Sequence, residues 1–198
     1  MILFLDIDGV LHPEPATAEQ GFCCRHLLWE ILLGQPALQV VISSDWRINH
    51  SLDYLIEKIT EGSPVELKHR FVGVTPFLPE AKHVYRGRER ECMAWLTQYL
   101  TESAPWFALD DVAGNFTFGT RQLHLVDYRT GLTEADVSKT LAEGYFEVSE
   151  DCLTGHVTPV DGNIFLDLGF PPEEAAQLKA ESDKQISFEL AKRKNQGK

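Results

Sequence analysis

Short apolar runs alternate along the chain with longer segments in which apolar residues recur every three or four positions. The runs occupy residues 2–5, 38–42, 71–74, 106–109 and 123–126. Because they carry few polar residues, they are typical of strands that are buried on both faces of a parallel sheet.

The intervening segments have the apolar period of amphipathic helices. We predict these helices over residues 17–33, 49–60, 88–100 and 133–143. Strands that alternate with helices indicate an α/β protein with a doubly wound parallel sheet and right-handed crossovers.

The composition of the chain changes beyond residue 150, where Gly and Pro residues become frequent. Pro171 and Pro172 then open a predicted final helix with an acidic first turn. We therefore expect one α/β domain over residues 1–148 and a loop-and-helix C-terminal extension over 149–198.

Composition narrows the classes of function. The chain has 198 residues, with 18 Lys and Arg against 30 Asp and Glu, and a formal net charge of −12. This charge disfavours a general nucleic-acid coat, because such proteins set positive charge against phosphates. No segment approaches the roughly 20 apolar residues of a membrane span, and the N-terminal residues lack the pattern of a signal peptide. We expect no membrane partner, a cytoplasmic location and reduced cysteines.

Polar clusters follow three of the predicted strands. They are Asp6 with Asp8, Ser43 with Ser44, and Asp110 with Asp111. The carboxyl ends of parallel strands meet at one edge of a sheet, which is where ligands bind. Converging carboxylates repel one another, and Mg²⁺ would relieve that repulsion. A carboxylate beside such a metal could attack a phosphate and form an aspartyl-phosphate.

These residues resemble the motifs of the haloacid dehalogenase (HAD) superfamily of phosphatases and phosphotransferases. The first motif resembles residues 6–11, which follow an apolar strand. The second resembles Ser43, and the acidic fourth motif resembles Asp110 and Asp111. The resemblance covers about residues 1–145 and implies a HAD-like fold. The segments 12–37 and 48–85 leave no room for a large lid, so we expect a minimal cap or none.

The resemblance also assigns roles to the first two motifs. It makes Asp6 the nucleophile and a Mg²⁺ ligand. It makes Asp8 first the general acid on the leaving oxygen and then the base for water, with its backbone carbonyl on the metal. It gives Ser43 a hydrogen bond to the phosphoryl group.

The remaining motifs supply charge. Asp110 would bind Mg²⁺ directly or through water, with Asp111 beside it. The third motif is a Lys or Arg near the start of a helix, and Arg86, Arg88 and Arg90 compete for that role. We favour Arg88.

Several nearby residues have alternative interpretations. Ser44 and Arg47 are further candidates for phosphate binding, although Arg47 could equally cap the strand end or pair with a surface acid. Trp46 is expected to pack rather than to stack on a base. His12 is expected to be a solvated loop residue.

A closer resemblance is to the HAD domain found in bacterial RNA-repair proteins. It rests on residues 6–11, 43–47, 91–96, 108–111 and 130–133. It implies a Mg²⁺-dependent phosphomonoester hydrolase acting on nucleotide or polynucleotide ends. The alternatives are a HAD phosphotransferase or small-nucleotide phosphatase, and a non-catalytic regulator in a toxin–antitoxin-like system.

The last alternative comes from the C-terminal extension. Its residues 156–176 resemble the start of helix-turn-helix antitoxins of the Xre type, without the part that holds the recognition helix in that family. DNA binding is therefore not expected there. The extension is interpreted as an arm for a protein partner or for self-association, or as an accretion packed on the core.

Overall fold

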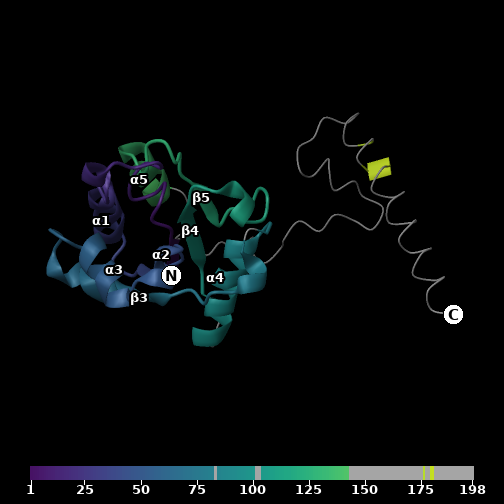
Figure 1. Cartoon of the computed structure of the whole chain (residues 1–198), viewed down its shortest axis with the longest axis horizontal. Helices are drawn as coiled ribbons and strands as arrows, with labels where there is room; N and C mark the ends of the chain where they lie inside the picture. Colours follow the sequence, from purple (N-terminus) through teal and green to yellow (C-terminus); the bar gives the residue numbers. More distant parts are fainter. Residues whose placement is uncertain (83, 101–103, 143–175, 177–178, 181–198) are drawn as a thin grey trace. The chain divides into compact units, whose positions relative to one another are not determined.

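The computed structural model describes residues 1–82, 84–100, 104–142, 176, 179 and 180. Contacts within the chain divide it into two units, Met1–Val148 and Ser149–Lys198. The second unit, with the predicted final helix and the Xre-like segment, lies almost entirely outside the described residues. Nearly all of the described residues belong to the first unit (Figure 1).

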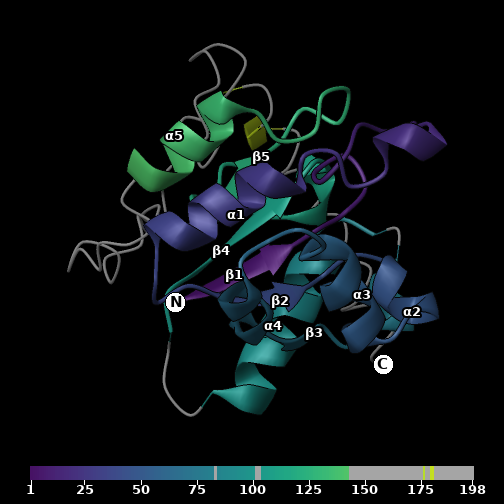
Figure 2. The same ribbon diagram turned by 90° about the vertical axis from the view of Figure 1, so that its left-hand side faces the viewer.

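A parallel sheet of five strands forms the centre of this unit, as the sequence predicts. The strands are β1 (Ile2–Leu5), β2 (Gln39–Ile42), β3 (Phe71–Val74), β4 (Trp106–Asp110) and β5 (Leu123–Leu125). They lie in the order β3-β2-β1-β4-β5, which Figure 2 displays. The chain builds outward from β1 in both directions, so the switch point between β1 and β4 is the expected ligand site.

Helices cover both faces of the sheet, which confirms the doubly wound α/β fold. They are α1 (Arg25–Gly34), α2 (Trp46–Asn49), α3 (Leu52–Ile59), α4 (Gly87–Tyr99) and α5 (Glu134–Ala142). Helices α1 and α5 lie side by side (Figures 1 and 2). They share one hydrophobic core with α3, whereas α4 packs in a second core.

The two cores follow from the alternation of side chains along a strand. In β1, Leu3 and Leu5 belong to the core under α1, whereas Ile2 and Phe4 belong to the core under α4. All four side chains are buried. A strand between two helical layers therefore needs an unbroken apolar run, which is the pattern that predicted it.

The first predicted helix, over 17–33, is interrupted in the structure. A short 3-10 helix, η1 (Ala18–Gln20), is followed by a turn in which Phe22 takes a φ of 59°. Helix α1 begins only at Arg25. The left-handed backbone at Phe22 breaks the helical hydrogen-bond pattern that the sequence period alone suggested.

The second predicted helix, over 49–60, corresponds to α3 but begins three residues later than expected. Helix α2 ends at Asn49, and the following His50 has extended backbone. Ser51 then caps α3 by accepting a hydrogen bond from the backbone N of Tyr54. An N-cap serine satisfies a backbone donor at the start of a helix, so it favours a new helix here.

The structure contains no separate lid domain in the two described stretches where one could be inserted. Residues 12–37 hold η1 and α1, and residues 48–82 hold parts of the sheet and its helices. No lid domain within these described stretches therefore covers the carboxyl edge of the sheet. Among the described residues, no helix has both the length and the apolar character needed to cross a membrane.

Candidate active site

Three carboxylates converge at the switch point of the sheet. Asp6 directly follows β1, Asp110 ends the neighbouring β4, and Asp111 comes next. One oxygen from each lies within 4.8 Å of the others. Asp6 and Asp110 are buried, so the sheet holds acidic groups close together with little water to screen them.

Backbone and amide donors fix these carboxylates in place. Asp6 Oδ1 accepts a hydrogen bond from the backbone N of Ile7 at 2.7 Å. Asp110 Oδ1 accepts one from the backbone N of Val112 at 2.8 Å and one from Asn115 Nδ2 at 3.2 Å. The donors leave other carboxylate oxygens for a ligand.

Gly9 allows the third carboxylate to approach. Its φ is +67°, and a Cβ atom built there would lie 2.5 Å from Asp111 Oδ2. Any other residue would push the Asp111 side chain aside and strain the turn. The absence of a side chain at Gly9, in the first motif, therefore leaves space for the carboxylate of Asp111, in the fourth motif.

Proximity and burial disfavour the ionised forms of the cluster. Burial raises the pKa of Asp6, although Arg88 and a hydrogen bond from Ser44 act in the opposite direction. Burial, and then the charge of Asp6, raises the pKa of Asp110 well above its ordinary value. The same two causes raise the pKa of Asp111 to about 6. A bound cation would offset this destabilisation.

The residues present fit a Mg²⁺ ion. Mg²⁺ prefers hard oxygen ligands, takes one or two carboxylates and keeps several waters. Asp6, Asp110 and Asp111 offer such oxygens from two adjacent strands and one loop. These three side chains would hold the ion.

Mg²⁺ is expected to stabilise the protein more at neutral pH than in acid. A carboxyl whose pKa is raised on folding destabilises the metal-free protein as pH rises from the ordinary value of Asp toward the raised one. For Asp111, the pH range over which this stability is lost ends near its raised pKa of about 6. Saturating Mg²⁺ should raise the melting temperature by on the order of 5–10 °C near pH 8.

Thermal unfolding with and without Mg²⁺ checks this expectation. Near pH 5 protons compete with the ion, so the increment should shrink. Asp111→Asn should reduce the increment near pH 8. An increment that is equal at both pH values, or unchanged in Asp111→Asn, would contradict the assignment of this cluster to Mg²⁺.

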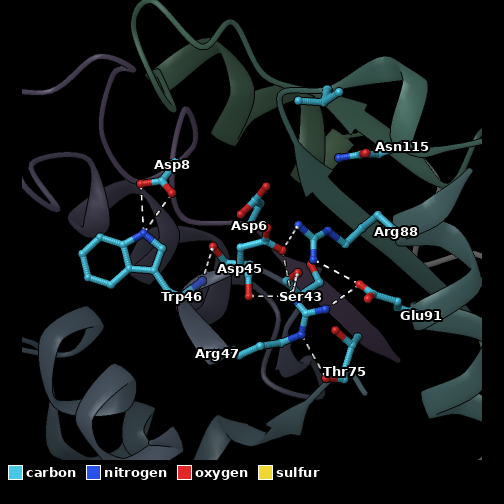
Figure 3. Close-up of polar contacts among 12 residues, drawn as sticks. Asp6, Asp8, Ser43, Asp45, Trp46, Arg47, Thr75, Arg88, Glu91 and Asn115 are labelled. Atoms are coloured by element: carbon cyan, nitrogen blue, oxygen red, sulfur yellow. Dashed lines mark hydrogen bonds and ion pairs between the residues drawn. The ribbon is translucent and has the colours of Figure 1, made fainter. Parts of the chain in front are cut away.

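Asp8 lies apart from the three-carboxylate cluster, although we expected four carboxylates to converge. Trp46 Nε1 lies 2.9 Å from each oxygen of Asp8 (Figure 3). His12 Nε2 lies 3.0 Å from Oδ1 of Asp8. His12 Nδ1 accepts from the backbone N of Phe22 at 3.4 Å, so Nε2 carries the hydrogen and donates to Asp8.

These donors favour the ionised form of Asp8. The hydrogen bond from His12 lowers the pKa of Asp8, and that from Trp46 adds to the effect against the opposing influence of burial. From the sequence, Trp46 was expected to pack and His12 to be a solvated loop residue. His12 is in fact buried, and both side chains hold the carboxylate of Asp8.

Only one of the three candidate arginines reaches the cluster. Arg86 is exposed, and its Nε donates to Glu89 at 2.7 Å. Arg90 is also exposed. The Nε of Arg88, in contrast, lies 4.0 Å from Asp110 Oδ2. The backbone explains this selection, because residues two positions apart on a helix point in different directions, and Arg86 precedes α4 with left-handed backbone.

Arg88 is held by its terminal nitrogens. Nη2 donates to Asp45 Oδ1 at 3.0 Å and Nη1 donates to Glu91 Oε2 at 3.1 Å (Figure 3). Burial alone would lower the pKa of Arg88, but the surrounding carboxylates, with Asp6 and Asp110 foremost, raise it. Arg88 is therefore a fixed cation beside the carboxylate cluster.

Three buried polar atoms at this edge lack a hydrogen-bond partner among the described residues. They are Arg88 Nε, Ser43 Oγ and Thr75 Oγ1, and the first two stand beside the carboxylate cluster. Ser43 follows β2, and its backbone N donates to the carbonyl of Leu5, so it stands beside the end of β1. Buried donors are costly when unpaired, and a pair of them beside an acidic site favours an oxygen-rich ligand.

Arg47 is placed differently from a phosphate ligand. Its side chain is 2% exposed. Its guanidinium donates to the carbonyl oxygens of Ser43 at 2.8 Å, Ser44 at 2.7 Å and Thr75 at 3.0 Å. The structure thus places Arg47 at the strand ends, which is the alternative to phosphate binding that the sequence left open.

A pocket of about 270 Å³ opens above the cluster. Asp6, Ser44, Arg88 and Asp111 line it, and Asp8 and Lys82 stand at its exposed side. The residues that line the rest of the pocket are Glu14, Asp45, Phe77, Ala81, Gly87, Glu91, Val112 and Asn115. Its size suits a phosphoryl group with part of a substrate, while the rest of the substrate stays outside.

Sequence reasoning did not single out Asn115 or Lys82. Asn115 lies on a short 3-10 helix, η4 (Ala113–Asn115), five positions after Asp110. A polar amide in the loop after an acidic strand end is a signal that could have identified it. Lys82 follows another 3-10 turn, η3 (Pro79–Ala81), whose course no motif predicts.

The parallel sheet and the acidic switch point define a HAD-like hydrolase fold. Comparison with protein families agrees, because residues 2–137 match the profile described as the HAD domain in Swiss Army Knife RNA repair proteins. The chain belongs to this family. Searches of curated proteins and of solved structures gave no match. The extension lies beyond the matched residues, and its Xre-like interpretation stays a prediction.

Proposed function

We propose that the protein is a Mg²⁺-dependent phosphatase that hydrolyses phosphomonoesters through a phosphorylated Asp6. One observation carries the proposal. The buried carboxylates of Asp6 and Asp110 and the half-buried one of Asp111 lie together beside two unpaired donors, Arg88 Nε and Ser43 Oγ. Acidic oxygens for a cation and free donors for an anion are the two parts that a phosphoryl site needs.

In the first step, an oxygen of Asp6 attacks phosphorus, and the bond from phosphorus to the leaving oxygen breaks. This step requires Asp8 in its protonated form; it donates the proton to that oxygen and becomes a carboxylate. Arg88 and Ser43 donate hydrogen bonds to the phosphoryl oxygens and stabilise their charge. Bound Mg²⁺ supplies positive charge that offsets the repulsion between carboxylate and phosphate.

In the second step, the carboxylate of Asp8 takes a proton from water. The water oxygen bonds to phosphorus, the bond from phosphorus to Asp6 breaks, and inorganic phosphate leaves. This step needs Asp8 in its ionised form, which the donors His12 and Trp46 favour. The two steps return Asp6 and Asp8 to their starting states.

We also propose that the substrates are phosphorylated nucleotide or polynucleotide ends. The family match supports this class. The open side of the pocket supports it as well, because the described stretches 12–37 and 48–82 form no lid domain, and Phe77 and Lys82 are exposed at the edge of the pocket. A bulky chain can therefore present its terminal phosphate while its body remains in solvent.

A phosphatase assay tests both parts of the proposal. The full chain should hydrolyse p-nitrophenyl phosphate with Mg²⁺ and lose this activity with a chelator. Oligonucleotides phosphorylated at either end are then compared with mononucleotides and sugar phosphates by kcat/KM. An absence of Mg²⁺-dependent turnover would overturn the enzyme assignment. Strong turnover of sugar phosphates without activity on polymer ends would overturn the substrate class alone.

A further inference from the structure

Glu91 joins two arginines at the wall of the proposed phosphoryl site. Its side chain is 6% exposed. Glu91 Oε2 accepts from Arg47 Nη2 at 2.5 Å and from Arg88 Nη1 at 3.1 Å (Figure 3). Its other oxygen accepts from the backbone N of Leu78 at 3.1 Å. Each oxygen of this buried carboxylate therefore has a defined donor.

The arrangement is electrostatically balanced. Burial and the nearby charge of Arg88 lower the pKa of Arg47, while Glu91 and Asp45 act in the opposite direction. The carboxylate of Asp45 lies between the same two guanidinium groups, at 3.0 Å from Arg88 and 3.4 Å from Arg47. Without Glu91, two buried cations would repel each other, and Arg88 would lose one of its two anchors.

The same contacts join separate elements of the fold. Arg47 binds the carbonyl oxygens that follow β2 and β3, and Glu91 links it to α4. Arg88 lies one helical turn before Glu91 on α4. Its two Nη groups face Glu91 and Asp45, which leaves Nε toward Asp110. The direction of that Nε–H is thus set by groups outside the carboxylate cluster.

We propose that Glu91 and Arg47 are positioning residues that hold Arg88 with its Nε–H directed at the transferring phosphoryl group, and that neither binds that group, although Glu91 lines the pocket. The inference rests on the proposed phosphatase function. Glu91 is a carboxylate and would repel a phosphate. The donors of Arg47 are directed to backbone carbonyls and to Glu91 instead.

A double-mutant cycle tests this proposal. Glu91→Gln keeps the shape of the side chain and loses its charge, and Arg88→Met removes the guanidinium. We expect Glu91→Gln to lower kcat/KM by on the order of 10²-fold, because small displacements of a catalytic group have effects of this size. In the Arg88→Met background, Glu91→Gln should have almost no further effect, since its influence passes through Arg88.

Glu89→Gln is the matched control. Glu89 is also a buried carboxylate on α4, but it binds Thr117 and Arg86 on another side of the helix. The substitution Glu89→Gln should leave kcat/KM unchanged. Equal losses in the Glu89 and Glu91 variants would mean that any buried charge on α4 matters. A Glu91 effect that is fully additive with Arg88→Met would also overturn the proposal.

A second variant and a second readout keep the test decisive. If Glu91→Gln fails to fold, as thermal unfolding would reveal, Arg47→Lys takes its place, because it keeps the charge but cannot reproduce the guanidinium contacts. If the wild type has no phosphatase activity, the same cycle is measured as the dissociation constant of inorganic phosphate in the presence of Mg²⁺. Coupling there would support the positioning role while the phosphatase function fails. A dissociation constant for phosphate that is unchanged in both the Glu91 and the Arg88 variants would overturn the positioning role.

Discussion

Asp6→Asn should reduce turnover of p-nitrophenyl phosphate below detection, a loss on the order of 10⁶-fold as for removal of other covalent nucleophiles. The amide keeps the shape of the side chain and can still accept the hydrogen bond from the backbone N of Ile7. It cannot form the phosphorylated intermediate. Because burial raises the pKa of Asp6, the neutral variant should be at least as stable as the wild type without metal.

The matched control for this experiment is Asp127→Asn. Asp127 is an exposed carboxylate that pairs with Arg129 outside the pocket. Its variant should retain full activity and nearly unchanged stability. If Asp6→Asn turned over substrate at the rate of the control, Asp6 would not be the nucleophile and the covalent mechanism would be abandoned.

The sheet and the carboxylate cluster were predictable because each depends on short stretches of sequence. A strand buried on two faces must be apolar throughout, so β1 was predicted at its observed bounds. The apolar run also predicted the bounds of β3, although that strand lies at the edge of the sheet and exposes Val72. The parallel arrangement then brings the strand ends to one edge, which places Asp6 beside Asp110 without knowledge of any contact.

The hydrogen bonds that hold the site residues in place were not predictable from the sequence. They join residues that are distant in the sequence and that lie on irregular backbone. Trp46 reaches Asp8 across 38 positions in the sequence, and the turn at Phe22 that fixes His12 lies inside a segment predicted as helix. Arg47 and Glu91 are 44 positions apart. Side-chain direction after a strand end depends on local φ and ψ values, which hydrophobic period does not report.

Asp8→Asn should separate the two chemical steps. The amide oxygen of the variant side chain can still accept hydrogen bonds from Trp46 and His12, so its position should be preserved. The nitrophenolate of p-nitrophenyl phosphate leaves without needing a proton, so phosphorylation of Asp6 should continue. Attack by water then lacks its base. Steady-state kcat should fall by about 10²–10⁴-fold, and phosphorylated Asp6 should accumulate.

Rapid acid quenching followed by intact-mass measurement checks this expectation, with a burst of nitrophenolate before the slow steady state. Asp53→Asn, an exposed carboxylate in the first turn of α3, is the control and should show neither effect. Slow turnover without a phosphorylated species would mean that Asp8 acts mainly in forming the intermediate. Substrates with poor leaving groups also need Asp8 as the acid in the first step. With a phosphorylated oligonucleotide, Asp8→Asn should therefore slow both steps and leave Asp6 largely unmodified.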